Sequence, residues 1–208
     1  GMHQRHAGRY HDWPGKPQHE FIADTMWHEV AYGRNAVYRN GHHGNAVLSR
    51  YPIVAQENAD ISAHAFESRG LLHCQVNLGK GAPILHCLNV HLGLFERGRQ
   101  WQIRALVDRI NETVPHDEPM IIAGDFNDWR RKGDRTLQEE LDVVEVFEAV
   151  KGRPARTFPS VMPVFRLDRI YARGLAVVDA RVHYAFPSGR MSDHAALAAT
   201  FEVVPTRP

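Results

Sequence analysis

Three consecutive segments between residues 82 and 124 constrain the fold more strongly than any other part of the sequence. In Ala82–Leu92, alternate residues separate into two faces, as they do in a β-strand. Arg99–Asn111 repeats apolar residues at helical spacing, which predicts an amphipathic helix. Met120–Ala123 is a short apolar strand that ends at Gly124. A strand, a helix and a second strand in this order indicate a mixed α/β domain in which helices flank sheets.

The rest of the chain adds more strands than helices to this unit. Apolar residues recur at helical spacing over Gln18–Ala31, which predicts a helix there, and Thr136–Leu141 is also expected to be helical. Residues 1–17 mix Gly, Pro, His and Arg without periodicity, so we expect a mobile N-terminal arm followed by one domain over residues 18–208. A loop is expected at Pro187–Arg190. Further strands are predicted at 35–38, 45–49, 69–78, 166–171, 177–184 and 195–203.

The composition argues against several classes of protein. The chain has 208 residues and a net charge of +1, and its 43% hydrophobic and 24% charged residues are ordinary for a soluble single domain. Such a charge balance argues against a polybasic nucleic-acid binder. The longest apolar runs are too short to cross a bilayer, and the polar start does not resemble a signal peptide. These features predict a cytoplasmic protein without a transmembrane segment.

The two cysteines, Cys74 and Cys87, fall in a predicted hairpin. If Gly79–Gly81 closes that hairpin and pairs Leu78 with Ala82, the two cysteines are one step out of register and face opposite sides. We therefore expect no disulfide between them, which fits a reducing compartment.

Four short polar clusters each lie at the end of an apolar strand, where side chains on a rigid sheet commonly perform catalysis. Each cluster alone has an ordinary structural explanation, such as an Asx turn, a capped strand start or a half-buried histidine with its own partner. Together and in this order they form a more specific pattern. The clusters are Asn89-Val-His91, Gly124-Asp125-Phe126-Asn127, Arg166-Leu-Asp168 and Ser192-Asp193-His194.

This order of clusters resembles the endonuclease/exonuclease/phosphatase superfamily, which includes apurinic endonucleases, deoxyribonuclease I, neutral sphingomyelinases and inositol polyphosphate phosphatases. The segment Gly44–Pro52 is also similar to the family's sequence ahead of the hairpin, so the resemblance covers residues 18–203. It implies a four-layered α/β/β/α sandwich, with two packed mixed sheets flanked by helices and the site at one end of the sheets. It also implies Mg²⁺-assisted hydrolysis of a phosphodiester or phosphomonoester by a water molecule.

The residues of the four clusters suit the chemistry that this resemblance implies. Asp125 can orient or deprotonate the attacking water, and Asn127, on the same side if the chain is extended, can donate to a phosphoryl oxygen. His194 can hold or relay a proton near neutral pH, with Asp168 fixing its tautomer. By the family pattern, His91 stands on the other side as a second proton donor or phosphate stabiliser. Which histidine is the acid and which is the base stays open.

One part of the family pattern is absent from the sequence. The family begins with a strand, a helix and a strand ending in Gln-Glu, whose glutamate holds the metal, and no such pair precedes Phe21. We therefore expect an N-terminally truncated domain in which Asp193 is the remaining metal carboxylate and Mg²⁺ or Mn²⁺ binds weakly. Either the sequence begins too late, or the chain is naturally short and inactive. Exposed strands would then favour a homodimer.

The sequence leaves the substrate class open. Arg97, Arg99 and Trp101 follow His91 closely, which makes Arg97 and Arg99 the expected substrate contacts, although Trp101 suits the core equally well. Nucleic acid and lipid or inositol phosphates are both compatible substrates. The alternative function is a catalytically silent binding or scaffold module of the same fold. A zinc hydrolase built from the histidines is less favoured, because they lack HExxH or a similar ligand spacing.

Overall fold

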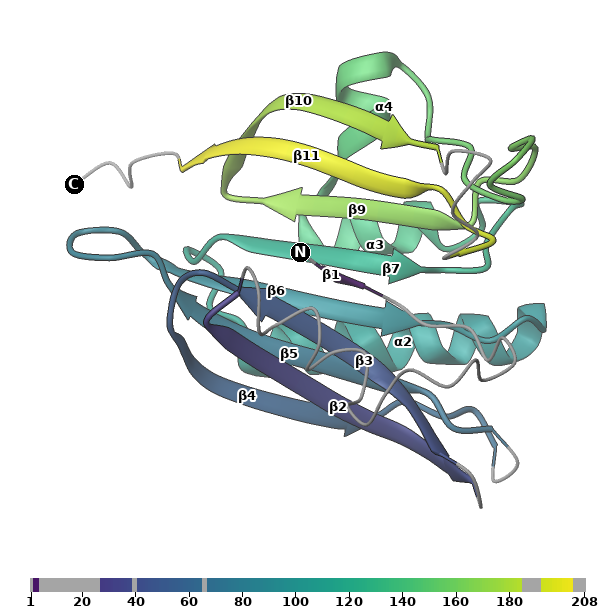
Figure 1. Cartoon of the computed structure of the whole chain (residues 1–208), viewed down its shortest axis with the longest axis horizontal. Coiled ribbons are helices and arrows are strands. Elements are labelled where there is room, and N and C mark those ends of the chain that lie inside the picture. The colour runs from purple at the N-terminus through teal and green to yellow at the C-terminus, as the bar shows by residue number, and fades with distance from the viewer. Residues whose placement is uncertain (1, 4–26, 39–40, 65–66, 185–191, 204–208) are drawn as a thin grey trace.

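The computed structural model covers the full chain and describes residues 2–3, 27–38, 41–64, 67–184 and 192–203 (Figure 1). Every strand predicted from residue 41 onward, and both helices predicted after residue 98, coincide with an observed element to within a few residues. The strand predicted at 35–38 is the C-terminal part of a longer strand that begins at Glu29. In chain order, the elements are β1 (Met2–His3), β2 (Glu29–Tyr38), β3 (Gly41–Ser49), β4 (Ile53–Asp60), β5 (Gly70–Asn77), β6 (Ile84–His91), α2 (Glu96–Thr113), β7 (Met120–Asp125), α3 (Asp134–Leu141), β8 (Val144–Glu145), α4 (Val146–Lys151), β9 (Asp168–Arg173), β10 (Leu175–His183) and β11 (Ala196–Val203).

A six-stranded sheet forms the centre of the molecule, with its strands in the order β4-β5-β6-β7-β9-β8. Strands β6 and β7 are parallel, and all the other neighbouring pairs are antiparallel. Helix α2 connects β6 to β7, because parallel neighbours need a crossover connection. The strand–helix–strand unit predicted from residues 82–124 is therefore confirmed at the middle of the sheet.

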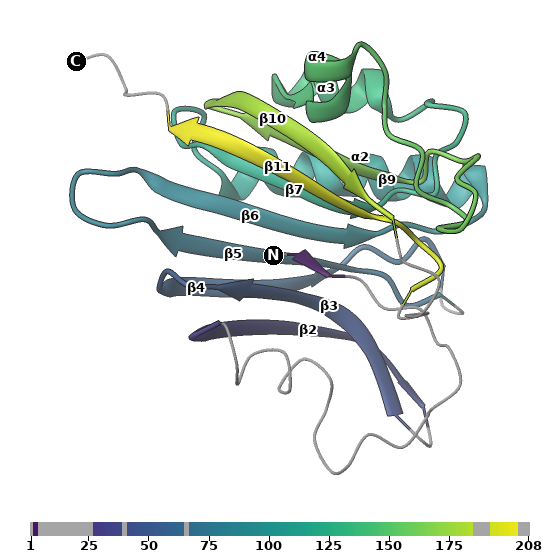
Figure 2. The same ribbon diagram turned by 45° about the horizontal axis from the view of Figure 1, so that its top comes forward.

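Helices α2 and α3 cover one face of this sheet (Figures 1 and 2). The apolar residues that recur at helical spacing in α2 are buried, as expected for an amphipathic helix on a sheet. This layer is held together by a core that includes Leu88, Val90, Ile103, Leu106, Ile110, Ile122, Leu137 and Tyr171.

Two smaller sheets cover parts of the opposite face. The sheet β1-β3-β2 packs over β4, β5 and β6, and the sheet β10-β11 packs with α4 over β7 and β9. The described chain thus has three layers: helices, the six-stranded sheet, and the pair of smaller sheets. The expected mixed α+β class is confirmed, whereas the outer helical layer of the expected sandwich is not among the described residues.

The helix predicted over Gln18–Ala31 is wrong at its C-terminal end. Residues from Glu29 onward belong to β2, which pairs with β3 along its whole length. Ala31 is fully buried in the core between the two sheets. Strand pairing and burial therefore outweigh the local helical periodicity, which is a weak determinant of structure on its own.

Some predicted features lie outside the described residues. They include the rest of that helix, since residues 4–26 are not described, and the loop at Pro187–Arg190. Of the N-terminal arm expected over residues 1–17, the structure describes Met2–His3, which pair with β3. Within the described ranges, none of the helices combines the length and the apolar character needed to cross a membrane.

The predicted hairpin is present, but its register differs by one residue from the expected one. Asn77 pairs with Ile84, so Cys74 and Cys87 lie directly opposite each other and share a face, and the prediction of opposite faces is wrong. The Asn77 side chain accepts a hydrogen bond from the Gly79 N–H (2.9 Å), a local turn that lengthens the loop. Both thiols are free, and burial raises the pKa of Cys74 to about 12 and that of Cys87 to about 11.

Two buried histidines form a hydrogen-bonded chain on strands β5 and β6. Nε2 of His73 lies 2.8 Å from Nδ1 of His86, and Nε2 of His86 bonds to the Glu118 carboxylate. Both imidazole rings are buried. Burial, and then the neighbouring His86, lower the pKa of His73 from 6.5 to about 4. His73 is therefore neutral in the folded protein at neutral pH.

We expect acid to destabilise the fold through His73. Its pKa is lower in the folded chain than in the unfolded one, so its contribution to stability is complete above about pH 6.5 and is lost as the pH falls toward 4. The loss should be on the order of 3 kcal/mol or less. The free energy of unfolding, measured with urea across this pH range, should depend less on pH in His73→Gln than in the unaltered chain. The glutamine amide offers His86 a polar partner but does not titrate. An unaltered profile in that variant, or equal flattening in the exposed control His183→Gln, would contradict this assignment.

Candidate active site

Three polar residues lie in register at one edge of the six-stranded sheet. His91, the last residue of β6, pairs with Asp125 of β7, and Asp125 pairs with Asp168 of β9. Residues paired on neighbouring strands point their side chains to the same face. His91, Asp125 and Asp168 therefore form a row across three strands, on the face that the smaller sheets partly cover. We call it the catalytic row after the role that we propose for it below.

Asp125 is the most enclosed member of the catalytic row. Its side chain is 1% exposed, and its Oδ2 lies 3.6 Å from Nε2 of His91. Its Oδ1 accepts a hydrogen bond from the backbone N–H of Asn127 (2.9 Å), and its carbonyl oxygen accepts one from the N–H of Leu92 (2.8 Å). These contacts hold the carboxylate in a defined position between His91 and Asp168.

His194 joins the row from the segment ahead of β11. Its Nδ1 lies 2.7 Å from Oδ2 of Asp168, so that Nδ1–H donates to the carboxylate. The ring of Phe158 packs against the imidazole, with the ring centroids 4.9 Å apart. Burial lowers the pKa of His194, but the hydrogen bond to Asp168 and the charges of Asp168, Asp125 and Asp193 raise it above its ordinary value overall. His194 therefore keeps its proton more readily than a free histidine.

A loop that the sequence patterns did not indicate holds His194 in place. The N–H of Ser160 donates to the carbonyl oxygen of Asp193 (2.7 Å), and the N–H of Ala195 donates to that of Thr157 (2.8 Å). The hydroxyl of Ser160 donates to the carbonyl oxygen of Ser192 (3.1 Å), 32 positions along the chain. Because these partners are far apart in sequence, no local spacing signals them.

Asn127 lies next to the catalytic row, but the extended conformation expected for it is wrong. Its φ is 49°, in the left-handed region that asparagine tolerates better than most residues. Its side-chain amide donates to the carbonyl oxygen of Leu92 (2.9 Å), and the residue is almost fully buried. Asn127 thus ties the end of β7 to the end of β6. An amide has a second proton, so donation to a phosphoryl oxygen stays a prediction.

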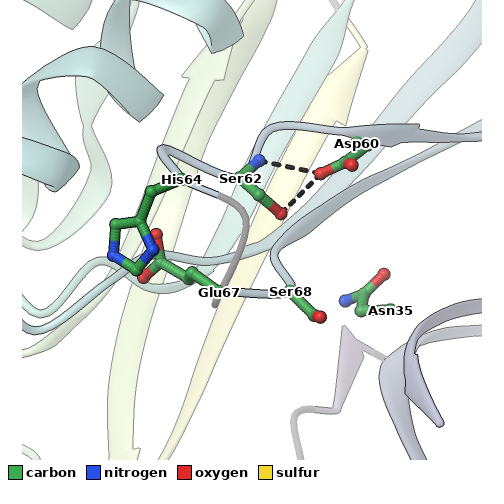
Figure 3. Close-up of a pocket in the computed structure, with 6 residues that line it drawn as sticks. All are labelled: Asn35, Asp60, Ser62, His64, Glu67 and Ser68. Carbon is green, nitrogen blue, oxygen red and sulfur yellow. Dashed lines mark hydrogen bonds between the residues drawn. The ribbon is translucent and has the colours of Figure 1, made fainter.

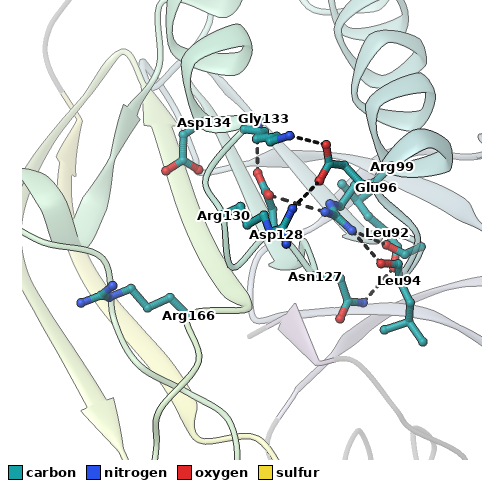
Figure 4. A network of polar contacts seen from close by, with 12 residues as sticks. Leu92, Leu94, Glu96, Arg99, Asn127, Asp128, Arg130, Gly133, Asp134 and Arg166 are labelled. Carbon is teal, nitrogen blue, oxygen red and sulfur yellow. Dashed lines mark hydrogen bonds and ion pairs between the residues drawn. The ribbon is translucent and has the colours of Figure 1, made fainter.

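Arg99 was expected to contact substrate, but it is a fully buried residue that organises the loop after β6 (Figure 4). Its guanidinium donates to the carbonyl oxygens of Gly93 (3.2 Å) and Leu94 (2.9 Å) and lies 3.7 Å from the Asp128 carboxylate. It also stacks over Trp129, 5.6 Å from the ring centroid. The prediction that Arg99 meets the substrate is wrong, because this residue occupies the buried side of α2.

Arg97 and Trp101 lie on the exposed side of the same helix. Trp101 is 52% exposed, so the alternative that placed it in the core is wrong. Arg97 stays a predicted substrate contact, close in sequence to His91.

Buried amides join the sheet β1-β3-β2 to the strands of the catalytic row. Nδ2 of Asn45 donates to the carbonyl oxygens of Gly70 (2.8 Å) and Asn89 (2.9 Å), and Nδ2 of Asn89 donates to that of Ala46 (3.0 Å). Asn89 is fully buried two residues before His91. The asparagine of the first polar cluster therefore has a structural role, since burying amides is favourable only when they are hydrogen-bonded.

A polar hollow of about 460 Å³ lies beside the loop between β4 and β5 (Figure 3). Glu67 of this loop accepts a hydrogen bond from Nε2 of Gln102 (2.6 Å), whose Oε1 accepts one from the N–H of Gly93 (2.7 Å). The hollow is thereby linked, through α2, to the loop that follows His91. Its lining residues are Asn35, Asp60, Ser62, His64, Glu67 and Ser68.

The described residues do not form a complete metal site. Among them, no group of three or more His, Cys, Asp or Glu side chains converges in a way that could hold an ion. Asp193, the carboxylate expected to face the metal, is exposed. Mg²⁺ demands near-octahedral oxygen coordination, so the described residues do not fit a bound Mg²⁺ or Mn²⁺ without further ligands.

The whole sequence, compared with known proteins, decides the family. Residues 3–194 match the model of the Endonuclease/Exonuclease/phosphatase family, which is most of the chain. The chain belongs to this family. The resemblance carried by the four polar clusters is therefore confirmed.

The chain is also similar to a curated relative and to solved structures of the same fold. The uncharacterized protein YbhP of Escherichia coli K12 is 47% identical over 200 residues, which cover 96% of this chain and 78% of YbhP. The Bacteroides thetaiotaomicron mannosyl-6-phosphatase superposes with a TM-score of 0.72 and 17% identity, covering 89% of this chain and 81% of that one. TDP2 of D. rerio, complexed with a single strand DNA product, superposes with a TM-score of 0.67 and 20% identity. The match covers 88% of this chain and 81% of that one.

One family structure is considerably longer than this chain. The endonuclease/exonuclease/phosphatase protein of Beutenbergia cavernae has a TM-score of 0.70 at 17% identity, and the match covers 93% of this chain but 60% of that protein. At identities this low, the likeness to solved structures shows the fold alone.

Arg99→Met should destabilise the protein by about 2–4 kcal/mol, because methionine fills the volume of the stem but leaves the buried Asp128 carboxylate without its cation and two carbonyl oxygens without their donor. Arg97→Met, on the exposed side of the same helix, should change stability by less than about 0.5 kcal/mol. Urea unfolding of the two variants at neutral pH compares them directly. Equal stabilities would contradict the structural role of Arg99.

Proposed function

We propose that the chain is a phosphoesterase that hydrolyses a phosphate monoester or diester with a water molecule, at the catalytic row and His194. The observation that carries the proposal is the hydrogen bond between His194 and Asp168 at the end of that row. A histidine held by a carboxylate beside a second carboxylate is a suitable proton donor or acceptor near neutral pH. Family membership supports the same reaction class, since the family comprises hydrolases of phosphate esters.

In this proposal, His194 supplies the proton that the departing oxygen needs. Nδ1–H donates to Asp168, so Nε2 is the nitrogen that exchanges a proton with substrate or water. The pKa of His194 is raised, after the opposing effect of burial, by Asp168, Asp125 and Asp193, which keeps the imidazolium populated beside an anionic phosphate. A cation placed there also stabilises the negative charge that develops in the transition state.

Asp125 is the proposed acceptor of the proton of the attacking water. Its carboxylate is enclosed and held by the backbone N–H of Asn127, so its orientation is set before substrate binds. His91, 3.6 Å from Asp125, is the proposed second donor to a phosphoryl oxygen, and the free amide proton of Asn127 is a third. Arg97 is the proposed contact to a more distant part of the substrate.

Mg²⁺ or Mn²⁺ is the proposed cofactor, because members of the family generally use a divalent metal. A bound divalent ion neutralises charge on the phosphate. The described residues, Asp193 included, do not fit such an ion by themselves. This same observation favours a second candidate function, a catalytically silent binding or scaffold module of the family fold.

The proposed substrate is nucleic acid or a lipid or inositol phosphate. Two proteins of the same fold handle different phosphate compounds, since one is a mannosyl-6-phosphatase and the other, TDP2, holds a single strand DNA product. A cytoplasmic location stays a prediction from the sequence. A homodimer is likewise a prediction from the sequence. Among the described strands, β11 pairs with β10 alone, and an open strand edge of this kind can pair with a second chain.

Hydrolysis of bis-p-nitrophenyl phosphate in the presence of Mg²⁺ or Mn²⁺ tests the proposal. We expect kcat/KM to fall by a factor on the order of 10²–10⁴ in Asp125→Asn, because it removes the acceptor of the water proton. The loss should be smaller in His194→Gln, because p-nitrophenolate departs without a proton and this substrate reports mainly the missing cation beside the phosphate. The exposed His183→Gln is the control and should retain activity. Full activity in His194→Gln would overturn its role. If the unaltered chain shows neither turnover nor metal binding by calorimetry, the silent module is favoured instead.

The pH dependence should identify the bond that tunes His194. Asp168→Asn removes the hydrogen-bonded charge that raises the pKa of His194, so the limb of the pH–rate profile due to this histidine should move toward acid. Asp193→Asn removes an exposed and weaker charge and should move the limb less. Equal shifts in the two variants, or no shift in Asp168→Asn, would argue against the assignment.

A further inference from the structure

Exposed apolar side chains border the candidate active site on two sides. Phe95 and Val161 are each 79% exposed, and Met162 is 71% exposed. Soluble proteins seldom gather side chains of this kind around one site unless the surface binds something apolar. We call this set the apolar rim; it consists of Leu94, Phe95, Trp129, Val161, Met162 and Val164.

The first side of the apolar rim projects from backbone that is firmly anchored to the catalytic row. Leu94 and Phe95 follow β6, and the carbonyl oxygen of Leu94 accepts a hydrogen bond from buried Arg99 (2.9 Å). Trp129 follows Asn127 and lies under the same guanidinium. These side chains therefore point outward from a fixed loop, and their exposure is not the result of a loosely held chain.

The second side comes from the loop that holds His194. Phe158 packs on the imidazole, and Ser160 donates to the carbonyl oxygen of Asp193. The N–H of Met162 donates to the carbonyl oxygen of Pro159 (3.1 Å), which forms a turn with Val161 at its tip. Figure 1 shows this loop at the end of the molecule where β6 and β7 also end, so the two sides of the rim come from loops at the same end of the fold as the catalytic row.

Exposed cations accompany the apolar side chains. Arg97 is exposed two residues from Phe95, and Arg153 and Arg156 are exposed on the segment that leads into the second side of the rim. Burial, and then the charges of Arg156 and other arginines, lower the pKa of Arg166 close by, which indicates a positive local potential. Glu96, the acidic residue beside Phe95, is paired with Lys132 and Arg130.

We propose that the apolar rim and its arginines dock the protein on an anionic membrane surface, so that the catalytic row meets a phosphate ester of a lipid. This inference rests on the proposed function and narrows its substrate class. Apolar side chains that enter the boundary between headgroups and acyl chains, next to cations that attract anionic lipid, are the combination by which peripheral proteins bind membranes.

The composition of the rim favours a membrane over two other partners, a single-stranded nucleic acid and a second copy of the chain. A single-stranded nucleic acid would be bound by stacking on aromatic rings, and the rim offers two of these, Phe95 and Trp129. The other four side chains, Leu94, Val161, Met162 and Val164, are aliphatic or thioether groups that suit acyl chains better than bases. A second copy of the chain, docked through the same face, would bring the exposed arginines of both copies together and be repelled. A lipid surface satisfies both the apolar and the cationic groups.

Vesicle sedimentation tests the inference with the full chain. The protein should bind vesicles of phosphatidylcholine mixed with phosphatidylglycerol, and bind pure phosphatidylcholine vesicles more weakly. The double variant Val161→Ser/Met162→Ser should lower the partition coefficient about tenfold or more. The matched control Val54→Ser/Val178→Ser alters exposed valines of β4 and β10, outside the rim, which are 52% and 51% exposed, and it should bind as the unaltered chain does.

Three outcomes would overturn the docking surface: no binding to the mixed vesicles, equal losses in the two double variants, or rim-dependent binding of a fluorescent oligothymidine without binding of vesicles. The last outcome would assign the rim to nucleic acid. Hydrolysis of soluble bis-p-nitrophenyl phosphate by the unaltered chain is measured in the same samples. Turnover without vesicle binding refutes the docking surface alone, and vesicle binding without turnover refutes the proposed chemistry alone.

Discussion

The pairing of β6, β7 and β9 is the constraint on which the candidate site depends. Because His91, Asp125 and Asp168 are direct neighbours across these strands, the sheet itself fixes their order and the face they share. A slip of β9 by one residue would turn Asp168 to the helical face and take its hydrogen bond away from His194. The central position of these strands, with helices on one face and smaller sheets on the other, makes such a slip costly.

Polar anchors then convert this strand register into a site with defined loops. Arg99 fixes the carbonyl oxygens after β6, Asn127 ties β7 to β6, and Ser160 holds the segment that carries His194. Each anchor is buried. Buried polar groups stabilise a fold only while their partners are in place. The residues that position the proposed site are thus also the ones whose loss would most affect the local fold. Kinetic and stability measurements on their variants therefore need to be compared with each other.

The sequence predicted the parts of this arrangement that depend on local patterns. The alternation in 82–92 and the helical spacing in 99–111 placed the strand and the crossover helix correctly. The polar clusters led to His91, Asp125 and Asp168, which are neighbours across three strands, while their catalytic roles stay proposals. It did not predict that Arg99 faces inward, since a helix of mixed polarity does not show which polar residue is buried. The register of Cys74 and Cys87 depended on one Asx turn at Asn77, and the strand at Glu29 depended on its pairing with β3. The errors at Glu29 and Arg99 share one cause, which is that tertiary partners decide what the local pattern leaves open. The register error is local, because the turn at Asn77 was not recognised.

The central claim is that Asp168 holds His194 as a protonated group in the catalytic row, and nuclear magnetic resonance of the imidazole nitrogens measures this directly. His194 should carry a proton on Nδ1 across neutral pH and titrate above the ordinary histidine value of about 6.5. A His194 ring that titrates below this value, or that is neutral with its proton on Nε2, would show that the hydrogen bond to Asp168 does not organise the site.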